Sequence, residues 1–289
     1  MELLIPESMT RIKKAVLNFF PSRLSLSAFI FLFGIFLLSV FIPFLSPYHE
    51  DIAGAAHFET AGQAPSLSHW FGTDTSGRDV FTITIRAALS SFKIAFGVVF
   101  FSVLVGVPIG MVSGLASKRT DEIIMRITDG FLAFPPLILP LAVTAILGPS
   151  LNNVVLGISI SWFPWYVRIA RSQSLIISSL DYVSISKSMG ANKFHIIKHH
   201  ILPNSLSPIL TQASIDAGYA ILASAGLSFI GLGAQYPDVE WGLLITQSRA
   251  QFLNNWWEVF FPGIFICLTV ASFNVLGDEI RNNNKTNNE

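Results

Sequence analysis

Several long stretches of this 289-residue chain carry no charged side chain, and each could cross a lipid bilayer. They lie at 24–49, 94–117, 130–167 and 259–277. A helix needs about 20 mostly apolar residues to cross the hydrocarbon core. The stretch 130–167 is long enough for two spans, with a strong turn signal, GPSLNN, at 148–153. With the apolar stretch 205–233, the sequence predicts an all-α integral membrane protein with six transmembrane helices.

The composition agrees with this prediction. Hydrophobic residues make up 52% of the chain and charged residues only 12%, with a mean hydropathy of +0.58. A soluble domain usually has about 25% charged residues. The formal net charge is zero, which argues against nucleic acid as the main partner.

The distribution of lysine and arginine predicts the orientation of the chain. The segments 1–25, 117–128, 168–204 and 278–289 together hold 14 of the 18 lysine and arginine residues. Cytoplasmic loops carry an excess of these residues. We therefore expect both termini in the cytoplasm of a multi-pass cell-membrane protein.

A polar and basic segment, YVSISKSMGANKFHIIKHHILPN at 182–204, interrupts the apolar chain. Its apolar residues repeat at helical spacing in two sets: Tyr182, Ile185 and Met189, then Phe194, Ile197 and Ile201. Gly190 stands where a helix needs a left-handed residue, Asn192 can cap a second helix, and Pro203 can end it. This pattern predicts a helix–turn–helix elbow on the cytoplasmic side, shaped to dock into a partner's groove.

Three other interpretations of this segment remain open. A DNA-binding helix–turn–helix has the right length, but its position between two membrane spans disfavours it. A metal site is conceivable at His195 and His199, which are four residues apart, although no carboxylate or thiolate accompanies them. The third is an amphipathic helix that lies on lipid headgroups.

Five segments of the chain resemble one family of membrane proteins. They are SMGANKFHIIKHHILPN in the elbow, FGTDTSGRDVF (71–81), DGFLAFPPLIL (129–139), LSFIGLG (227–233) and GDEIR (277–281). They resemble the dipeptide/oligopeptide/nickel branch of the binding-protein-dependent ABC permeases, in particular its C-type subunit, over roughly residues 70–281. The resemblance implies the fold of a type I ABC importer permease with a coupling-helix elbow.

The resemblance also implies which residues couple transport to the ATPase. They are Ser184, Ile185, Ser186, Gly190, His200 and Pro203. The family usually has Glu-Ala-Ala where this chain has Ser184, Ile185 and Ser186, so the expected carboxylate is absent. Gly190 and Pro203 are retained, so the shape of the elbow should persist while the ATPase contact lacks that carboxylate.

The resemblance divides the chain as follows. We expect a cytoplasmic N-terminus (1–25), a first transmembrane helix (26–45), an extracytoplasmic segment (46–90), a five-helix permease core (91–278) with its coupling loop (170–204), and a cytoplasmic tail (279–289). The implied partners are a homologous permease, two ATP-binding subunits, an extracytoplasmic solute-binding protein and membrane lipid.

The expected function is ATP-driven import by alternating access, with short peptides or nickel- or cobalt-type chelates as substrates. The chain lacks the G-x-x-x-x-G-K-[ST] loop that cradles nucleotide phosphates. We therefore expect it to be no enzyme and to bind no cofactor or metal itself, with ATP and Mg on partner subunits. The alternatives are an ion-gradient-driven secondary transporter, which would show mid-membrane ionisable residues and an inverted repeat, and a structural membrane scaffold.

Asp216 is the acidic residue set well inside an apolar stretch. A charged side chain at the bilayer centre is costly, so Asp216 should face protein or water. It could line the translocation path and meet a cationic substrate group. It could instead lie near the cytoplasmic end of its span, as its early position in 205–233 suggests. A double G-x-x-x-G at Gly106, Gly110 and Gly114 predicts close packing of the second span against another helix.

Overall fold

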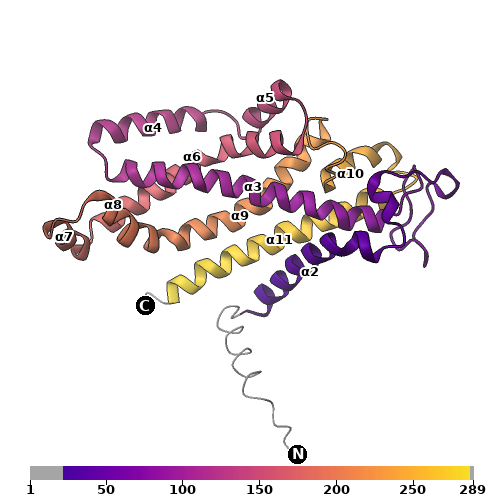
Figure 1. The fold of residues 1–289 in the computed structure, drawn as a ribbon, viewed down its shortest axis with the longest axis horizontal. Helices are drawn as coiled ribbons and strands as arrows, with labels where there is room; N and C mark the ends of the chain where they lie inside the picture. Colours follow the sequence, from indigo (N-terminus) through magenta and orange to yellow (C-terminus); the bar gives the residue numbers. More distant parts are fainter. Residues whose placement is uncertain (1–21, 287–289) are drawn as a thin grey trace, which may run out of the picture.

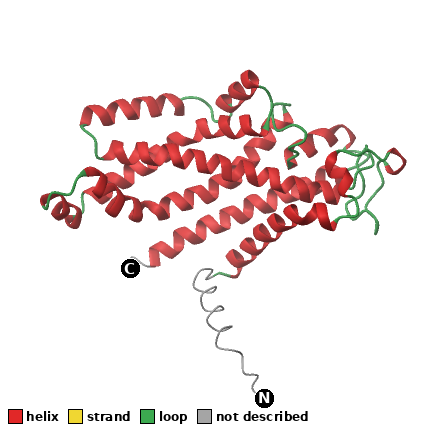
Figure 2. Cartoon of the chain, viewed as in Figure 1, coloured by secondary structure: helices red, strands yellow, loops and turns green. Residues whose placement is uncertain are grey.

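The computed structural model describes residues 22–286, which form helices joined by short connections and one longer segment (Figures 1 and 2). Five long helices run side by side: α2 (Arg23–Leu45), α3 (Val80–Gly114), α6 (Leu151–Ser178), α9 (Leu202–Phe229) and α11 (Trp257–Thr286). The shorter helices are α4 (Lys118–Leu132), α5 (Ile138–Leu147), α7 (Asp181–Ser188), α8 (Lys193–Ile196) and α10 (Trp241–Ser248). Most of the expected cytoplasmic N-terminus, and residues 287–289 of the expected tail, lie outside the described residues.

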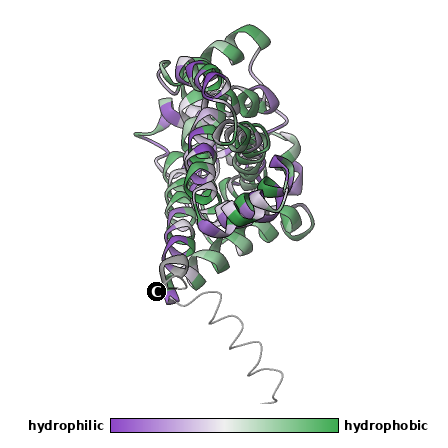
Figure 3. Cartoon of the chain, turned by 90° about the vertical axis from the view of Figure 1, so that its left-hand side faces the viewer, coloured by the Kyte–Doolittle hydropathy of each residue, from purple (hydrophilic) through white to green (hydrophobic). Residues whose placement is uncertain are grey.

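Within the described residues, three helices are long and apolar enough to cross a membrane. They are α2, α3 and the part Trp257–Asn282 of α11. Helices α6 and α9 have 28 residues each, which at 1.5 Å per residue exceeds the thickness of the hydrocarbon core, although both are less apolar. The all-helical prediction is confirmed. In Figure 3, seen from the elbow end, hydrophobic residues make up much of the ribbon and hydrophilic patches interrupt them.

Helix α3 is longer than the charge-free run that predicted it. It begins at Val80 because the Asp79 carboxylate caps it, accepting a hydrogen bond from the Thr82 backbone N–H at 2.8 Å. Residues 80–90, expected as part of the extracytoplasmic segment, are therefore helical, and the helix carries Arg86 and Lys93. A charge does not end a helix, so the uncharged run 94–117 underestimates its length.

The chain between α3 and α6 differs from the continuous span expected at 130–147. Helix α4 ends at Leu132 and α5 begins at Ile138, and the two together run beside α6 in the opposite direction (Figure 1). The break contains Pro135 and Pro136, whose rings and missing N–H groups prevent a continuous helix. The turn predicted at 148–153 is confirmed, since Ser150 caps α6 through the Asn153 backbone N–H.

The most extensive helix contact, between α3 and α6, depends on the three glycines of the double G-x-x-x-G. A Cβ atom on Gly106 would lie 2.4 Å from the Phe163 carbonyl oxygen, and one on Gly110 would lie 2.3 Å from the Val167 carbonyl oxygen. The two backbones therefore meet where no side chain intervenes. The predicted close approach is confirmed, and its role is packing.

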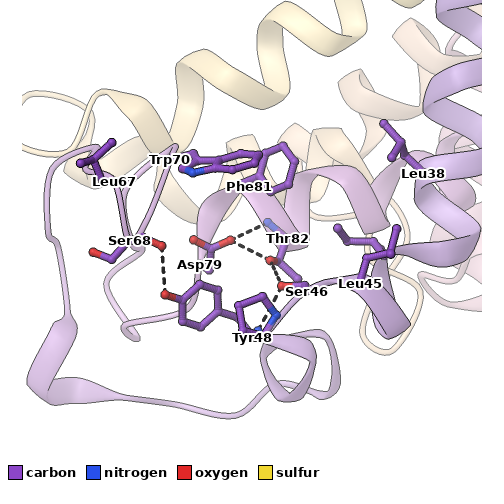
Figure 4. A pocket seen from close by; sticks show the side chains of 12 residues that line it. Leu38, Leu45, Ser46, Tyr48, Leu67, Ser68, Trp70, Asp79, Phe81 and Thr82 are labelled. Atoms are coloured by element: carbon purple, nitrogen blue, oxygen red, sulfur yellow. Dashed lines mark hydrogen bonds between the residues drawn. The ribbon is translucent and has the colours of Figure 1, made fainter.

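Residues 46–79 fold over the end of the bundle opposite the elbow (Figure 1). The Asp51 carboxylate accepts a hydrogen bond from the Asp79 backbone N–H at 2.7 Å, and the Trp257 indole donates to the Thr73 carbonyl at 3.0 Å. Beside Asp79, an apolar hollow of about 540 Å³ opens between this segment and α2 (Figure 4). At the wall of this hollow, the Asp79 carboxylate accepts hydrogen bonds from the backbone N–H and the hydroxyl of Thr82. The Tyr48 hydroxyl donates a hydrogen bond to the Ser68 carbonyl at 2.9 Å.

A charged contact joins this segment to the loop that follows α9. Arg78 pairs with Asp74 at 2.7 Å, donates a hydrogen bond to the Tyr236 hydroxyl and lies over the Tyr236 ring. Burial opposes the charge on Arg78, but Asp74 and Tyr236 outweigh it, so the pKa of Arg78 lies above its usual value. The Arg78 guanidinium therefore stays charged at any physiological pH.

Candidate functional site

The elbow lies at the extreme end of the bundle, between α6 and α9 (Figure 1). Two residues separate the end of α6 at Ser178 from the start of α7 at Asp181. After α8, the residues Ile197–Ile201 form a π-helical turn that leads without a gap into α9 at Leu202. Both neighbouring long helices are therefore joined almost rigidly to the elbow. Residues 170–178 of the expected coupling loop belong to α6.

The turn of the elbow has the geometry that the sequence predicts. Gly190 has φ +92°, and a Cβ atom there would meet no atom within 4 Å. The Ala191 backbone N–H donates to the Ser186 carbonyl at 3.1 Å, closing the end of α7. Asn192 caps α8, accepting a hydrogen bond from the His195 backbone N–H at 2.8 Å. The positive φ at Gly190 and the cap at Asn192 are both confirmed.

The expectation that Pro203 ends the second short helix is wrong. Pro203 lies in the first turn of α9, which continues from the π-helical turn. Pro203 has no backbone N–H to donate to the preceding turn, and the helix is π-helical over Ile197–Ile201 directly before it, where the regular α-helical hydrogen bonding is already altered. The chain therefore passes from the elbow into α9 without a stop.

The elbow has a buried anchor and an exposed apolar surface. Val183, Ile196 and Ile201 are buried. The apolar side chains exposed on the elbow are Tyr182, Ile185, Met189 and Phe194. This exposed set, which we call the elbow surface, includes the whole apolar face predicted for α7. Between the two short helices lies an open hollow of about 400 Å³, lined by residues that include Ser186, Gly190 and His195.

The six residues assigned to ATPase coupling lie in this elbow and at the start of α9, but they differ in environment. Ser184, Ile185, Gly190 and Pro203 are exposed, whereas Ser186 and His200 are half-buried. The His200 imidazole lies 3.2 Å from the Ser186 hydroxyl, a hydrogen bond that joins α7 to the π-helical turn. Ser186 and His200 therefore hold the elbow's shape, while Ser184 and Ile185 are available to a partner.

The histidines of the elbow stack rather than form a ligand cage. The His195 and His199 rings lie 4.2 Å apart and nearly parallel. Within residues 22–286, no group of three or more His, Cys, Asp and Glu side chains is placed to hold a metal ion. The arrangement gives no support to the metal interpretation of this segment.

Two ion pairs that the sequence reasoning did not identify join α4 to α6. Arg171 binds Asp121 through two nitrogens at 2.6 and 2.7 Å, and Asp121 also accepts a hydrogen bond from Ser113 of α3. Arg168 binds Asp129 at 2.7 Å. Two arginines three residues apart share one helix face, and this spacing is the signal that could have revealed them. They lie on α6 shortly before the elbow.

Asp216 lies at the midpoint of α9, not near either end of the helix. The helix begins at Leu202, so Asp216 is about 20 Å from either end at 1.5 Å per residue. Its carboxylate is half-buried and accepts a hydrogen bond from the Gln212 amide at 2.9 Å. This central position removes the expectation that Asp216 reaches water at a helix terminus.

Comparisons with known proteins agree with this geometry. Residues 106–283 match the family described as "Binding-protein-dependent transport system inner membrane component", so the chain belongs to the binding-protein-dependent ABC permeases. It is the membrane-spanning, non-catalytic subunit of an ABC importer and holds no cofactor of its own. Family membership excludes the secondary-transporter and scaffold alternatives.

Among curated proteins, the chain is 41% identical to the probable D,D-dipeptide transport system permease protein DdpC of Escherichia coli (strain K12), covering 96% of this chain and 92% of that protein. It is 39% identical to the dipeptide transport system permease protein DppC of Alkalihalophilus pseudofirmus, over 90% and 84%. It is 34% identical to the glutathione transport system permease protein GsiD of Pectobacterium atrosepticum, over 91% and 87%.

Among solved structures, a chain of the inward-facing MetNI methionine ABC transporter is similar to this one. It has a TM-score of 0.59 and 19% identity, and it covers 69% of this chain and 95% of that chain. At this identity the likeness concerns the fold alone. It agrees with the prediction of an ABC importer permease fold.

Proposed function

We propose that this chain is the C-type permease of an importer of short peptides. Six crossings would be made by α2, α3, the pair α4–α5, α6, α9 and α11, with both termini in the cytoplasm. A homologous permease would complete the path. Two ATP-binding subunits would bind the pair of permeases, one of them at the elbow of this chain. A solute-binding protein would deliver substrate to the opposite end. Asp216, at mid-helix, would line the path.

The observation that carries the peptide assignment is the identity of 34–41% to three permeases named for dipeptides or glutathione, over at least 90% of this chain. These substrates share a peptide or peptide-like backbone with free ionised ends. The chelate alternative receives no comparable support, because no described residues form a metal-binding group.

The mechanism follows from how the elbow is joined to the bundle. ATP-driven closure of the ATP-binding subunits would move the elbow surface. Because α6 and α9 enter the elbow with almost no flexible linker, their ends would move with it. The ion pairs from Arg168 and Arg171 would carry the movement of α6 to α4. Rotation of these helices against the partner permease would alternate access to the path.

Uptake in a reconstituted complex tests the substrate class. The complex of this chain, its homologous permease, the ATP-binding subunits and the binding protein would be placed in proteoliposomes. We expect ATP-dependent accumulation of radiolabelled dialanine and no accumulation of a nickel chelate. Accumulation of the nickel chelate without dialanine would contradict the peptide assignment.

Ser184→Glu should preserve or strengthen the assembly with the ATP-binding subunits. Ser184 is exposed on α7, so the longer carboxylate meets no steric obstacle within this chain. The resemblance also implies a glutamate at this position. The measurement is the amount of ATP-binding subunit that copurifies with the variant, compared with Ser188→Glu, which places the same charge at the last residue of α7. Loss of the subunits from Ser184→Glu alone would show that this elbow docks differently.

A further inference from the structure

We propose that the centre of α9 contains a binding site for a primary ammonium group, which the N-terminus of a transported peptide would fill. Asp216 supplies the charge, Gln212 and Tyr166 position it, and Tyr219 extends the site along the exposed face. The inference rests on the proposed peptide import and assigns to this chain a share in substrate recognition.

The first observation is the cost of Asp216 at its position. A carboxylate at the middle of a membrane-spanning helix is stable only against protein or water, so the face of α9 that carries it is not a lipid face. Within residues 22–286, no lysine, arginine or histidine forms an ion pair with Asp216. A carboxylate held in this way is complementary to a cation that arrives from outside the chain.

The second observation is a tyrosine hydroxyl beside the carboxylate. Tyr166 on α6 is fully buried, and its hydroxyl interacts with the Asp216 carboxylate, although the geometry falls short of an ordinary hydrogen bond. Buried hydroxyls usually have a partner, and Asp216 is the partner of this one, so Tyr166 helps to hold the carboxylate in place. The Gln212 amide donates a hydrogen bond to one carboxylate oxygen and limits its rotation.

The third observation is the stripe on which Asp216 lies. Gln212, Asp216 and Tyr219 are four and three residues apart, so they share one face of α9. The Tyr219 side chain is 52% exposed in this chain, one turn from the carboxylate. An aromatic ring next to a carboxylate suits an organic ammonium, which can contact the face of the ring and donate hydrogen bonds to the oxygens.

These groups discriminate between kinds of cation. A divalent metal ion prefers several carboxylate, carbonyl or imidazole ligands, whereas this site offers one carboxylate and one amide. A primary ammonium has three N–H donors, and the two carboxylate oxygens of Asp216 provide charged acceptors for them. The N-terminus of a peptide is the ammonium group that every unmodified short peptide carries.

Paired uptake assays on the reconstituted complex test the site. Radiolabelled dialanine and N-acetyl-dialanine, which lacks the ammonium, are each supplied at a concentration that saturates the binding protein. We expect Asp216→Asn to slow dialanine uptake about tenfold or more, as for loss of a charged hydrogen bond, and to leave N-acetyl-dialanine uptake unchanged. Asp216→Glu, which keeps the charge, should retain most of the dialanine uptake.

The ring at position 219 provides a matched pair. Tyr219→Phe keeps the aromatic face and should behave as the wild type, whereas Tyr219→Leu should slow dialanine uptake selectively. An equal fall for both peptides in Asp216→Asn, or no fall for either, would overturn the ammonium site while leaving peptide import intact. Failure of the wild-type complex to accumulate dialanine would instead overturn the proposed function, and this inference with it.

Discussion

Gly110→Val is expected to remove most of the folded chain from the membrane. The new side chain would meet backbone on α6, since even its Cβ atom would lie 2.3 Å from the Val167 carbonyl oxygen and 2.8 Å from the Ala170 Cβ. Backbone cannot rotate aside as a side chain can, so α3 and α6 must separate along their whole contact. Overpacking of an ordinary core destabilises a protein by about 1–3 kcal/mol. We expect a clash with helix backbone to cost at least the upper end of that range.

The measurement is the amount of monodisperse chain recovered by size-exclusion chromatography after detergent extraction. Gly34→Val is the matched control, because a Cβ atom on Gly34 in α2 meets nothing within 4 Å. We expect the control to match the wild type and Gly110→Val to be largely lost or aggregated. Equal recovery of the two variants would show that the α3–α6 contact is looser than described.

Gly190→Val is expected to abolish coupled uptake while leaving the chain inserted and assembled. The site has open space, so the effect comes from the backbone alone: at φ +92°, a β-branched residue is strained by about 1–2 kcal/mol. The turn would relax to negative φ and redirect α8 relative to α7. The elbow surface would then lose its shape while the helices of the bundle keep theirs.

The test of Gly190 compares dialanine uptake with ATP hydrolysis in the same proteoliposomes. Gly190→Asn is the control, because asparagine accepts left-handed backbone more readily than other non-glycine residues. We expect uptake to be highest in the wild type, lower in Gly190→Asn and lowest in Gly190→Val, while ATP hydrolysis persists in all three. Normal uptake by the Val variant would mean that the turn geometry does not matter for coupling.

The local features of the elbow could be predicted because each depends on neighbouring residues. Gly190 follows a helical apolar pattern and Asn192 precedes another, so the turn and the cap needed no knowledge of the rest of the chain. The prediction that Pro203 ends the second short helix was wrong because proline is found both at helix ends and in first helical turns. Only the path of the chain into α9 decides between these roles.

The position expected for Asp216 depended on the limits of its apolar stretch. Asp216 lies early in the stretch 205–233, so a terminal position was a reasonable expectation. The structure begins α9 at Leu202 and places Asp216 at its centre. The residues that surround it, such as Tyr166 on α6, come from another helix, and the sequence contains no local pattern that pairs them.

Charge-free runs predicted that long helices are present, but they predicted the first and last residues of these helices less well. They mark the part of the chain that tolerates lipid, and a helix continues past a charge wherever its backbone allows, as α3 does through Lys93 and Arg86. Conversely, the uncharged run after Asp129 contains the Pro135–Pro136 break, which hydropathy does not detect. The ion pairs of Arg168 and Arg171 depend on the resulting position of α4 against α6.

Site-specific cross-linking tests most directly the claim that the elbow meets the ATP-binding subunits. Cys267 is the chain's single cysteine, so Cys267→Ser gives a background free of native thiols in this chain. In that background, Ile185→Cys places a thiol on the elbow surface at a side chain that is 60% exposed, and Leu253→Cys places one at a 93% exposed side chain at the opposite end of the bundle. A photoactivatable reagent on each thiol would be activated in the assembled complex. The account predicts that the probe at position 185 captures an ATP-binding subunit and the probe at position 253 does not, and capture at 253 without capture at 185 would contradict it.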